Sequence, residues 1–153
     1  MYSAFDVAKY FLVKDTMSPK KLQKIVYYAY GWTLALLNDT IDDLHFRLFA
    51  NRIEAWVHGP VVPDLYHHYK EFGWKDIPKL DKYDGPIFSP DIEDILNQVW
   101  DVYGNFSANQ LEMLSHREMP WVNARNGIAA YAVASNPISD EDLFIFFNEQ
   151  VNS

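Results

Sequence analysis

Five histidines of this sequence could bind a metal ion or transfer a proton, namely His45, His58, His67, His68 and His116. Metal-binding histidine pairs on a helix usually stand four residues apart, and no two of these histidines have that spacing. Because the chain contains no cysteine, a zinc site would need histidine and carboxylate ligands gathered from distant segments. The spacing therefore favours structural or surface roles for the histidines, and we expect no metal ion and no cofactor.

A histidine and a carboxylate also occur close together at His116 and Glu118, just before Pro120-Trp121. Such a pair can act in general acid–base catalysis, but it can equally form a local hydrogen bond that orients a turn. The chain has no G-x-S-x-G motif and no glycine-rich phosphate-binding loop. We therefore expect no catalytic residue, and an enzyme that uses His116, Glu118 or His58 is the least favoured function.

A basic cluster stands at Lys20, Lys21 and Lys24. It is either a set of solvated positions or a small contact patch for an acidic protein segment or for RNA. The chain carries a formal net charge of −8 at pH 7, whereas nucleic-acid-binding domains usually carry a basic field that neutralises phosphates. The charge therefore disfavours RNA and leaves a protein contact as the functional interpretation.

Aromatic residues make up 16% of the chain, and four of them follow the lysines at Tyr27, Tyr28, Tyr30 and Trp32. Neighbouring positions on a helix point in different directions, so these rings cannot all face one core. We expect Tyr27 either to pack under a nearby β-ribbon or to line a binding groove, because tyrosine and tryptophan are enriched at interfaces.

The elements that must position these residues are mainly helices, because apolar side chains recur at helical spacing along most of the chain. Serine followed by proline marks two helix starts, at Ser18 and Ser89, and Ser107 with Gln110 matches a capping box. The predicted helices span residues 3–14, 19–37, 63–72, 90–103, 108–114, 120–124 and 140–151.

A shorter period marks residues 44–58, where apolar and polar residues alternate in the runs 44–48 and 53–57. This alternation predicts two small strands of a ribbon, which Gly59-Pro60 brings to an end. Residues 74–88 have the composition of a loop, and residues 127–138 receive no assignment. The predicted fold is mainly α (α+β), a compact bundle of about six or seven helices with a small two-stranded β-ribbon, in a single domain over residues 1–153.

The N-terminus lacks a basic start and a long apolar run. No stretch approaches the roughly 18 uninterrupted apolar residues of a membrane span. The absence of cysteine fits a reducing compartment. We therefore expect a cytoplasmic protein that does not associate with membranes.

Two segments together resemble a known family. The first is Leu22-Gln23-Lys24-Ile25-Val26-Tyr27-Tyr28, and the second is Glu54-Ala55-Trp56-Val57-His58-Gly59-Pro60-Val61-Val62-Pro63. Their pairing resembles the Panacea antitoxin domain family, also called the SocA-like or GepA-like family, which is found in bacteria and their phages. The C-terminal half is similar too, at Ser107-Ala108, His116-Arg117-Glu118 and Pro120-Trp121, so the resemblance covers nearly the whole chain.

The resemblance implies an antitoxin of a toxin–antitoxin system, which binds a toxin protein that is usually encoded beside it. At least one relative delivers its toxin to the ClpXP protease, so both direct blocking and delivery for proteolysis stay open. The alternative is a phage or mobile-element protein that binds a different host protein on the same scaffold. The family implies no metal, cofactor or catalytic residue, and a homodimer of the free protein also stays open.

We predict a partner-binding surface from the aromatic and basic residues of these segments and their neighbours: Lys20, Lys24, Tyr27, Tyr28, Trp56, His58 and Tyr66. Tryptophan and tyrosine anchors commonly dominate interface energetics. The structural alternative is that Trp56 and Gly59-Pro60 only fix a turn between the ribbon and the next helix. The chain departs from the family where members often carry an acidic turn, because Arg47 and Arg52 stand there instead. That departure leaves the local conformation open.

Overall fold

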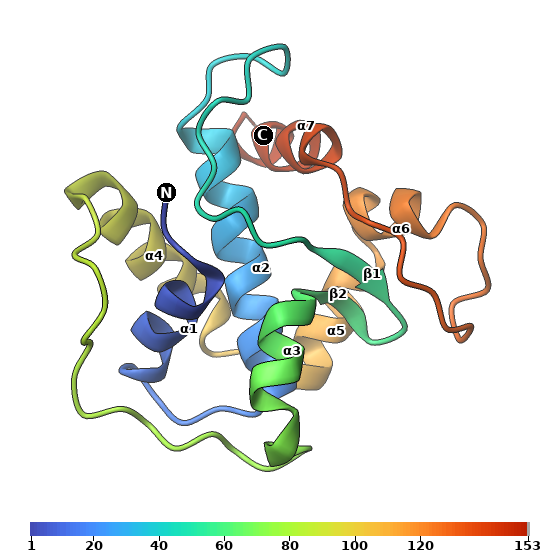
Figure 1. The fold of residues 1–153 in the computed structure, drawn as a ribbon. Helices are drawn as coiled ribbons and strands as arrows, with labels where there is room; N and C mark the ends of the chain where they lie inside the picture. Colours follow the sequence, from blue (N-terminus) through green and yellow to red (C-terminus); the bar gives the residue numbers. More distant parts are fainter. Residues whose placement is uncertain (153) are drawn as a thin grey trace.

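One long helix runs through the middle of the structure. The computed structural model describes residues 1–152, and α2 (Pro19–Leu36) lies at its centre with the other elements arranged around it (Figure 1). Every residue from Leu22 to Gly31 is buried, so α2 is covered on all sides and not along one apolar stripe. The predicted central helix is confirmed, and its burial is wider than the apolar spacing indicated.

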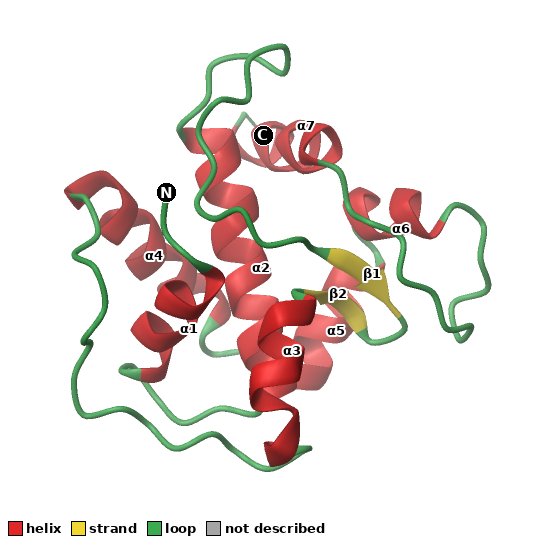
Figure 2. Ribbon diagram, viewed as in Figure 1, coloured by secondary structure: helices red, strands yellow, loops and turns green. Residues whose placement is uncertain are grey.

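Seven α-helices and one short 3-10 helix are present in residues 1–152 (Figure 2). Besides α2 they are α1 (Ala4–Leu12), α3 (Pro63–Tyr69) with the 3-10 helix η1 (Lys70–Phe72), α4 (Pro90–Tyr103), α5 (Ala108–His116), α6 (Met119–Arg125) and α7 (Asp140–Val151). Together with one two-stranded antiparallel sheet, these helices confirm the predicted fold class. None of the helices in this part of the chain is long and apolar enough to cross a membrane.

Local caps explain where several helices begin. Ser18 Oγ accepts a hydrogen bond from Lys21 N at 3.2 Å, and Pro19 follows at the first helical position. Ser107 and Gln110 form the predicted capping box, in which each side chain accepts a hydrogen bond from the other residue's backbone N–H. A side-chain cap contributes about 1 kcal/mol and depends only on neighbouring residues.

α2 contacts α7 and α4 most extensively, and a glycine lets α7 approach closely. A Cβ atom at Gly31 would overlap the ring of Phe147 on α7. Phe147 is fully buried, which contributes about 1.5–3 kcal/mol of hydrophobic stabilisation. The N-terminal half of α2 contacts the β1–β2 hairpin region. There the buried side-chain amide of Gln23 donates to Val62 O and accepts from Val62 N.

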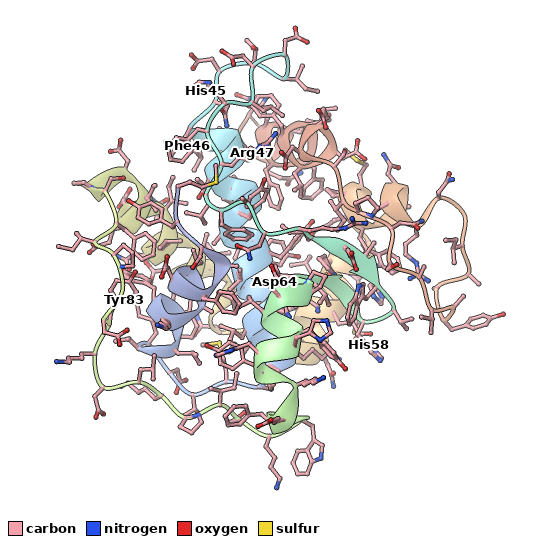
Figure 3. The ribbon with its side chains drawn as sticks, in the orientation of Figure 1. His45, Phe46, Arg47, His58, Asp64 and Tyr83 are labelled. Atoms are coloured by element: carbon pink, nitrogen blue, oxygen red, sulfur yellow. The ribbon has the colours of Figure 1, made fainter. Side chains whose placement is uncertain are left out.

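The β-ribbon is a hairpin made partly of other residues than predicted. β1 (Glu54–Trp56) pairs with β2 (Gly59–Val61) across the two-residue turn Val57-His58. The prediction of a strand in residues 44–48 is wrong, and Gly59-Pro60 continues the ribbon instead of ending it. Figure 3 shows His58 at the tip of this hairpin.

The backbone of Gly59 and the register of Pro60 explain why the second strand is tolerated. Gly59 has a φ of 107°, which residues with a Cβ atom rarely adopt. Ala55 stands opposite Pro60 and donates its N–H to Asn136 O at 2.8 Å, away from β2. The Ala55–Pro60 pair is therefore not a hydrogen-bonded pair, so the missing N–H of proline costs no hydrogen bond of the ladder.

Residues 44–48, in which apolar and polar side chains alternate, form an irregular segment that is held in place by hydrogen bonds to the side chain of Asn38. The Asn38 amide donates to Phe46 O and accepts from Phe46 N, each at 2.9 Å. Asn38 therefore satisfies the backbone groups that a neighbouring strand would satisfy. Leu48 is buried in the core, which accounts for the apolar alternation without a strand.

The two arginines that depart from the family pattern both form ion pairs. Arg47 Nε lies 2.9 Å from Asp140 Oδ2 at the start of α7, and Arg52 Nε lies 2.8 Å from Glu54 Oε2. Figure 3 shows Arg47 near α7 and well away from His58. The segment with the departure is therefore fixed to α7 and to β1.

Candidate protein-binding site

A groove with a volume of about 420 Å³ opens beside the N-terminal half of α2. The β1–β2 hairpin, α3 and residues 133–135 form its other sides. The apolar and aromatic side chains in its lining are Leu22, Trp56, Val57, Val61, Leu65, Tyr66, Tyr69, Val133 and Ala134. A mostly apolar depression with a few polar groups is the form that binding sites commonly take.

Five of the seven residues predicted for partner binding line this one groove, namely Lys20, Lys24, Trp56, His58 and Tyr66. The two lysines come from α2, Trp56 and His58 from the hairpin, and Tyr66 from α3. The packing of the hairpin and α3 against α2 brings these residues together (Figure 1).

Two aromatic rings stand side by side at the groove. The rings of Trp56 and Tyr66 lie 5.0 Å apart in an edge-to-face arrangement, and 42% of Tyr66 is exposed. Trp56 also has a structural role, because its carbonyl accepts a hydrogen bond from Trp121 Nε1 at 2.8 Å. The turn-fixing role and a surface role are compatible for Trp56, because the backbone serves the first while the ring lines the groove, with its Nε1 donating to Glu54 Oε1 at 2.8 Å.

A polar network joins the groove to α5. Lys20 forms an ion pair with Glu112, and His58 Nδ1 lies 3.1 Å from Glu112 Oε2. Burial raises the pKa of Glu112, but the hydrogen bonds from Lys20 and His58 outweigh that effect and leave the pKa below its ordinary value. Glu112 could not be found from the sequence, because no local spacing connects a residue of α5 with Lys20 or His58.

Lys24 is the least ordinary residue of the groove lining, because only 1% of it is exposed. Its ammonium donates a hydrogen bond to Pro60 O at 3.2 Å. Burial and, less strongly, the nearby Lys20 charge together lower the pKa of Lys24 to about 7, against the raising effect of Glu112. A Cβ atom at Gly59 would lie 2.6 Å from Lys24 Cε, so the hairpin glycine also makes room for this lysine.

Tyr27 and Tyr28 lie in the core and not at the groove, because both are fully buried. The Tyr28 ring stacks on Tyr103 with centroids 4.0 Å apart, and its hydroxyl donates to Glu118 Oε1 at 2.7 Å. Neither tyrosine is part of the groove lining, so their position does not fit a direct contact with a partner in the groove. The physical reason is that α2 is surrounded on every side, which the sequence does not reveal.

Arg125 supports the wall of the groove from behind. It is 2% exposed, and its guanidinium donates to Ala55 O at 3.1 Å, to Ala129 O at 2.7 Å and to Ala132 O. These bonds tie the segment after α6 to β1, and Val133 follows directly in the groove wall. The structural role of Arg125 could not be predicted, because nothing local in the sequence indicates the burial of an arginine.

A comparison with known families decides where the chain belongs. The model of the family described as "Antitoxin SocA-like, Panacea domain" matches residues 22–122. The chain belongs to this family. The matched residues include Lys24, Trp56, His58 and Tyr66 of the groove, while Lys20 and the wall at 133–135 lie outside them. No curated protein and no solved structure matches the chain.

The three candidate catalytic side chains of this Panacea domain have separate partners. The His116 ring stacks on Trp121 with centroids 4.2 Å apart, and burial lowers its pKa. Burial raises the pKa of Glu118 to about 7, against the opposing hydrogen bond from Tyr28. His58 pairs with Glu112, and neither His116 nor Glu118 is part of the groove lining.

Proposed function

We propose that this Panacea domain is the antitoxin of a toxin–antitoxin system and that it neutralises its toxin by direct protein–protein binding at the groove. The observation that carries the proposal is the convergence of five predicted contact residues on one apolar groove in a member of an antitoxin family. An aromatic pair such as Trp56 and Tyr66 in an apolar depression is a typical anchor of protein interfaces. Basic side chains at its edge would orient the partner.

Binding and not catalysis is the proposed activity, because the candidate acid–base side chains have other partners. His116 packs on Trp121 and Glu118 accepts from Tyr28. We place the protein in the cytoplasm together with a toxin encoded by a neighbouring gene. Two modes of neutralisation are compatible with a groove contact: the antitoxin blocks the toxin, or it holds the toxin for a protease such as ClpXP.

Co-expression tests the proposal. The neighbouring gene is induced in a bacterial host with and without this protein, and the protein is then recovered by an affinity tag. Rescue from growth arrest with a stable complex supports a blocking antitoxin, whereas rescue with rapid loss of the toxin and no complex supports delivery to a protease. If no neighbouring gene is toxic and no partner is recovered, the proposal fails.

A matched pair of tyrosine variants places the contact. Tyr66→Ser removes an anchor from the groove, and we expect toxin binding at least about tenfold weaker with loss of rescue. Tyr131→Ser is the control, because Tyr131 is 85% exposed and is not part of the groove lining. Equal binding by the two variants would move the contact surface away from the groove.

A further inference from the structure

The ammonium of Lys24 is buried with fewer partners than it can use. A lysine ammonium has three N–H donors. Within residues 1–152 it makes one hydrogen bond, to Pro60 O, and no carboxylate lies within ion-pair distance of it. A buried charge is costly unless it is paired and hydrogen-bonded. The groove lining therefore contains a cation whose hydrogen-bonding capacity is mostly unused.

The charges around Lys24 leave this end of the groove positive. Lys20 lines the groove one turn before Lys24 and lies in the first turn of the 18-residue helix α2, where the helix dipole is positive. His116 on α5 and the acid Glu112 also interact with Lys24, and His58 of the groove lining pairs with Glu112. Glu112 is already shared between Lys20 and His58. A local positive site thus stands in a chain whose net charge is −8.

We propose that the groove recognises a segment of the partner protein in which apolar side chains flank one aspartate or glutamate, and that this carboxylate pairs with Lys24 and Lys20. The inference rests on the proposed function and names the chemistry of the toxin segment. The apolar side chains would pack on Trp56, Tyr66 and Leu65, which line the same groove. Rearrangement of side chains such as Lys20 would admit the carboxylate, as is common at interfaces.

The lowered pKa of Lys24 in the free protein is consistent with a site for a partner carboxylate. Burial lowers the pKa of Lys24 to about 7, so part of the population is neutral near that pH. An arriving carboxylate would stabilise the charged form and raise the pKa. Binding would then be coupled to the uptake of a proton at Lys24.

Peptide selection tests the inference without any toxin. A library of random peptides, displayed on phage as N-terminal fusions without free carboxyl termini, is selected on the full chain. We expect enrichment of apolar residues around a single Asp or Glu. An enriched peptide is then synthesised with an amidated end, together with its Gln-for-Glu or Asn-for-Asp counterpart. The neutral peptide should bind about 10- to 100-fold more weakly, as expected for loss of a charged hydrogen bond.

Two lysine variants test whether Lys24 contributes to this effect. Lys24→Met keeps the buried volume and removes one of the two charges that the carboxylate would meet, so the difference in affinity between the two peptides should become smaller. An unchanged difference would overturn the role of Lys24. Lys21→Met is the control, because Lys21 donates to Gly104 O at 2.6 Å and is not part of the groove lining. This variant should keep the difference between the peptides. Circular dichroism and urea unfolding confirm that both variants are folded.

Several results would overturn the inference. They are enrichment of apolar peptides with no acid, enrichment of basic peptides, equal affinity of the acidic and neutral peptides for the unmodified chain, and failure to retain any peptide. Enrichment of a sequence from this chain itself would assign the groove to a second copy. Success here with no toxic neighbouring gene would leave the recognition chemistry intact while the toxin–antitoxin proposal fails.

Discussion

Two buried cations lie at the groove, Lys24 in its lining and Arg125 behind the wall at residues 133–135. They differ in the number of carbonyl groups that accept their hydrogen bonds. Arg125 behind the wall is 2% exposed and donates to three backbone carbonyls, those of Ala55, Ala129 and Ala132. Its guanidinium also lies 5.2 Å from the centre of the Trp121 ring. Lys24 in the groove lining is 1% exposed and donates to one carbonyl, that of Pro60.

The difference separates a structural cation from one that is available to a partner. Arginine stays charged and offers a rigid set of donors, so Arg125 can satisfy several carbonyls of an irregular segment at once. Lysine is a point charge whose pKa shifts readily on burial, and burial lowers the pKa of Lys24 to about 7. Burial alone therefore does not reveal the role of a charged residue, whereas the number of its acceptors does.

The largest effect that would test this contrast is expected for Arg125→Met. The substitution leaves Ala55 O without the donor of its buried hydrogen bond, which costs about 1–3 kcal/mol. It also removes the two part-buried bonds to Ala129 O and Ala132 O, which lie closer to solvent and cost less. We expect the free energy of unfolding to fall by roughly 2–4 kcal/mol in urea titrations at pH 7. A loss below about 1 kcal/mol would contradict the structural role of Arg125.

Lys24→Met should have the opposite effect near neutral pH. The folded pKa of Lys24, about 7, lies below its ordinary value of 10.5, so the unfolded chain binds more protons between these values. Stability contributed by this residue therefore rises with pH above 7, by at most about 1.4 kcal/mol per pH unit, and its cost is fully present below pH 7. The variant should lose this rise. It should also be more stable than the unmodified chain at pH 7, because a pKa lowered from 10.5 to about 7 corresponds to a cost of roughly 5 kcal/mol, which exceeds the loss of about 1–3 kcal/mol when Pro60 O is left without its donor.

Urea unfolding between pH 7 and pH 9 measures this slope for both chains. Glu118 does not obscure it, because its folded pKa of about 7 lies above the ordinary 4.5, so its contribution falls with pH below 7 and is constant above. The buried tyrosines, whose ordinary pKa is 10.0, act only at higher pH. Identical slopes for the two chains would show that Lys24 keeps an ordinary pKa in the fold.

The smallest change in stability is expected for Val133→Asp in the groove wall. Val133 is 93% exposed, so the free energy of unfolding should change by less than about 0.5 kcal/mol. Toxin binding should weaken, because the new carboxylate interrupts the apolar lining and repels an acidic segment. Ile87→Asp is the matched control, since Ile87 is 89% exposed and is not part of that lining. Unchanged toxin binding by Val133→Asp would remove the wall that Arg125 supports from the contact surface.

The bounds of the helices could be predicted from the sequence better than those of the strands, for one physical reason. The side chain of Ser18 bonds a backbone group three residues along the chain, so the start of α2 can be predicted locally. The strand pairing of Pro60 with Ala55 depends instead on the outward hydrogen bond from Ala55 to Asn136. The apolar alternation in residues 44–48 likewise reflects the burial of Leu48 and the hydrogen bonds from Asn38 to Phe46. The spacing of apolar residues does not predict these contacts.

The candidate site shows the same division. Five of the seven predicted residues meet at the groove because the two family segments and their neighbours lie on elements that pack together. Tyr27 and Tyr28 do not, because α2 is covered on all sides. Glu112 and Arg125 were missed, since their partners in the groove and its wall come from distant segments.

The sequence by itself determined the helix starts, the mainly helical fold and the kinship with an antitoxin family, because caps, periodicity and motifs involve residues that are close along the chain. Only the tertiary structure decided which faces were covered and which charges became buried. The bond from Lys24 to Pro60 spans 36 positions and the bond from Arg125 to Ala55 spans 70. Burial and partner number are sums over such long-range contacts, so they exist only once the chain is folded.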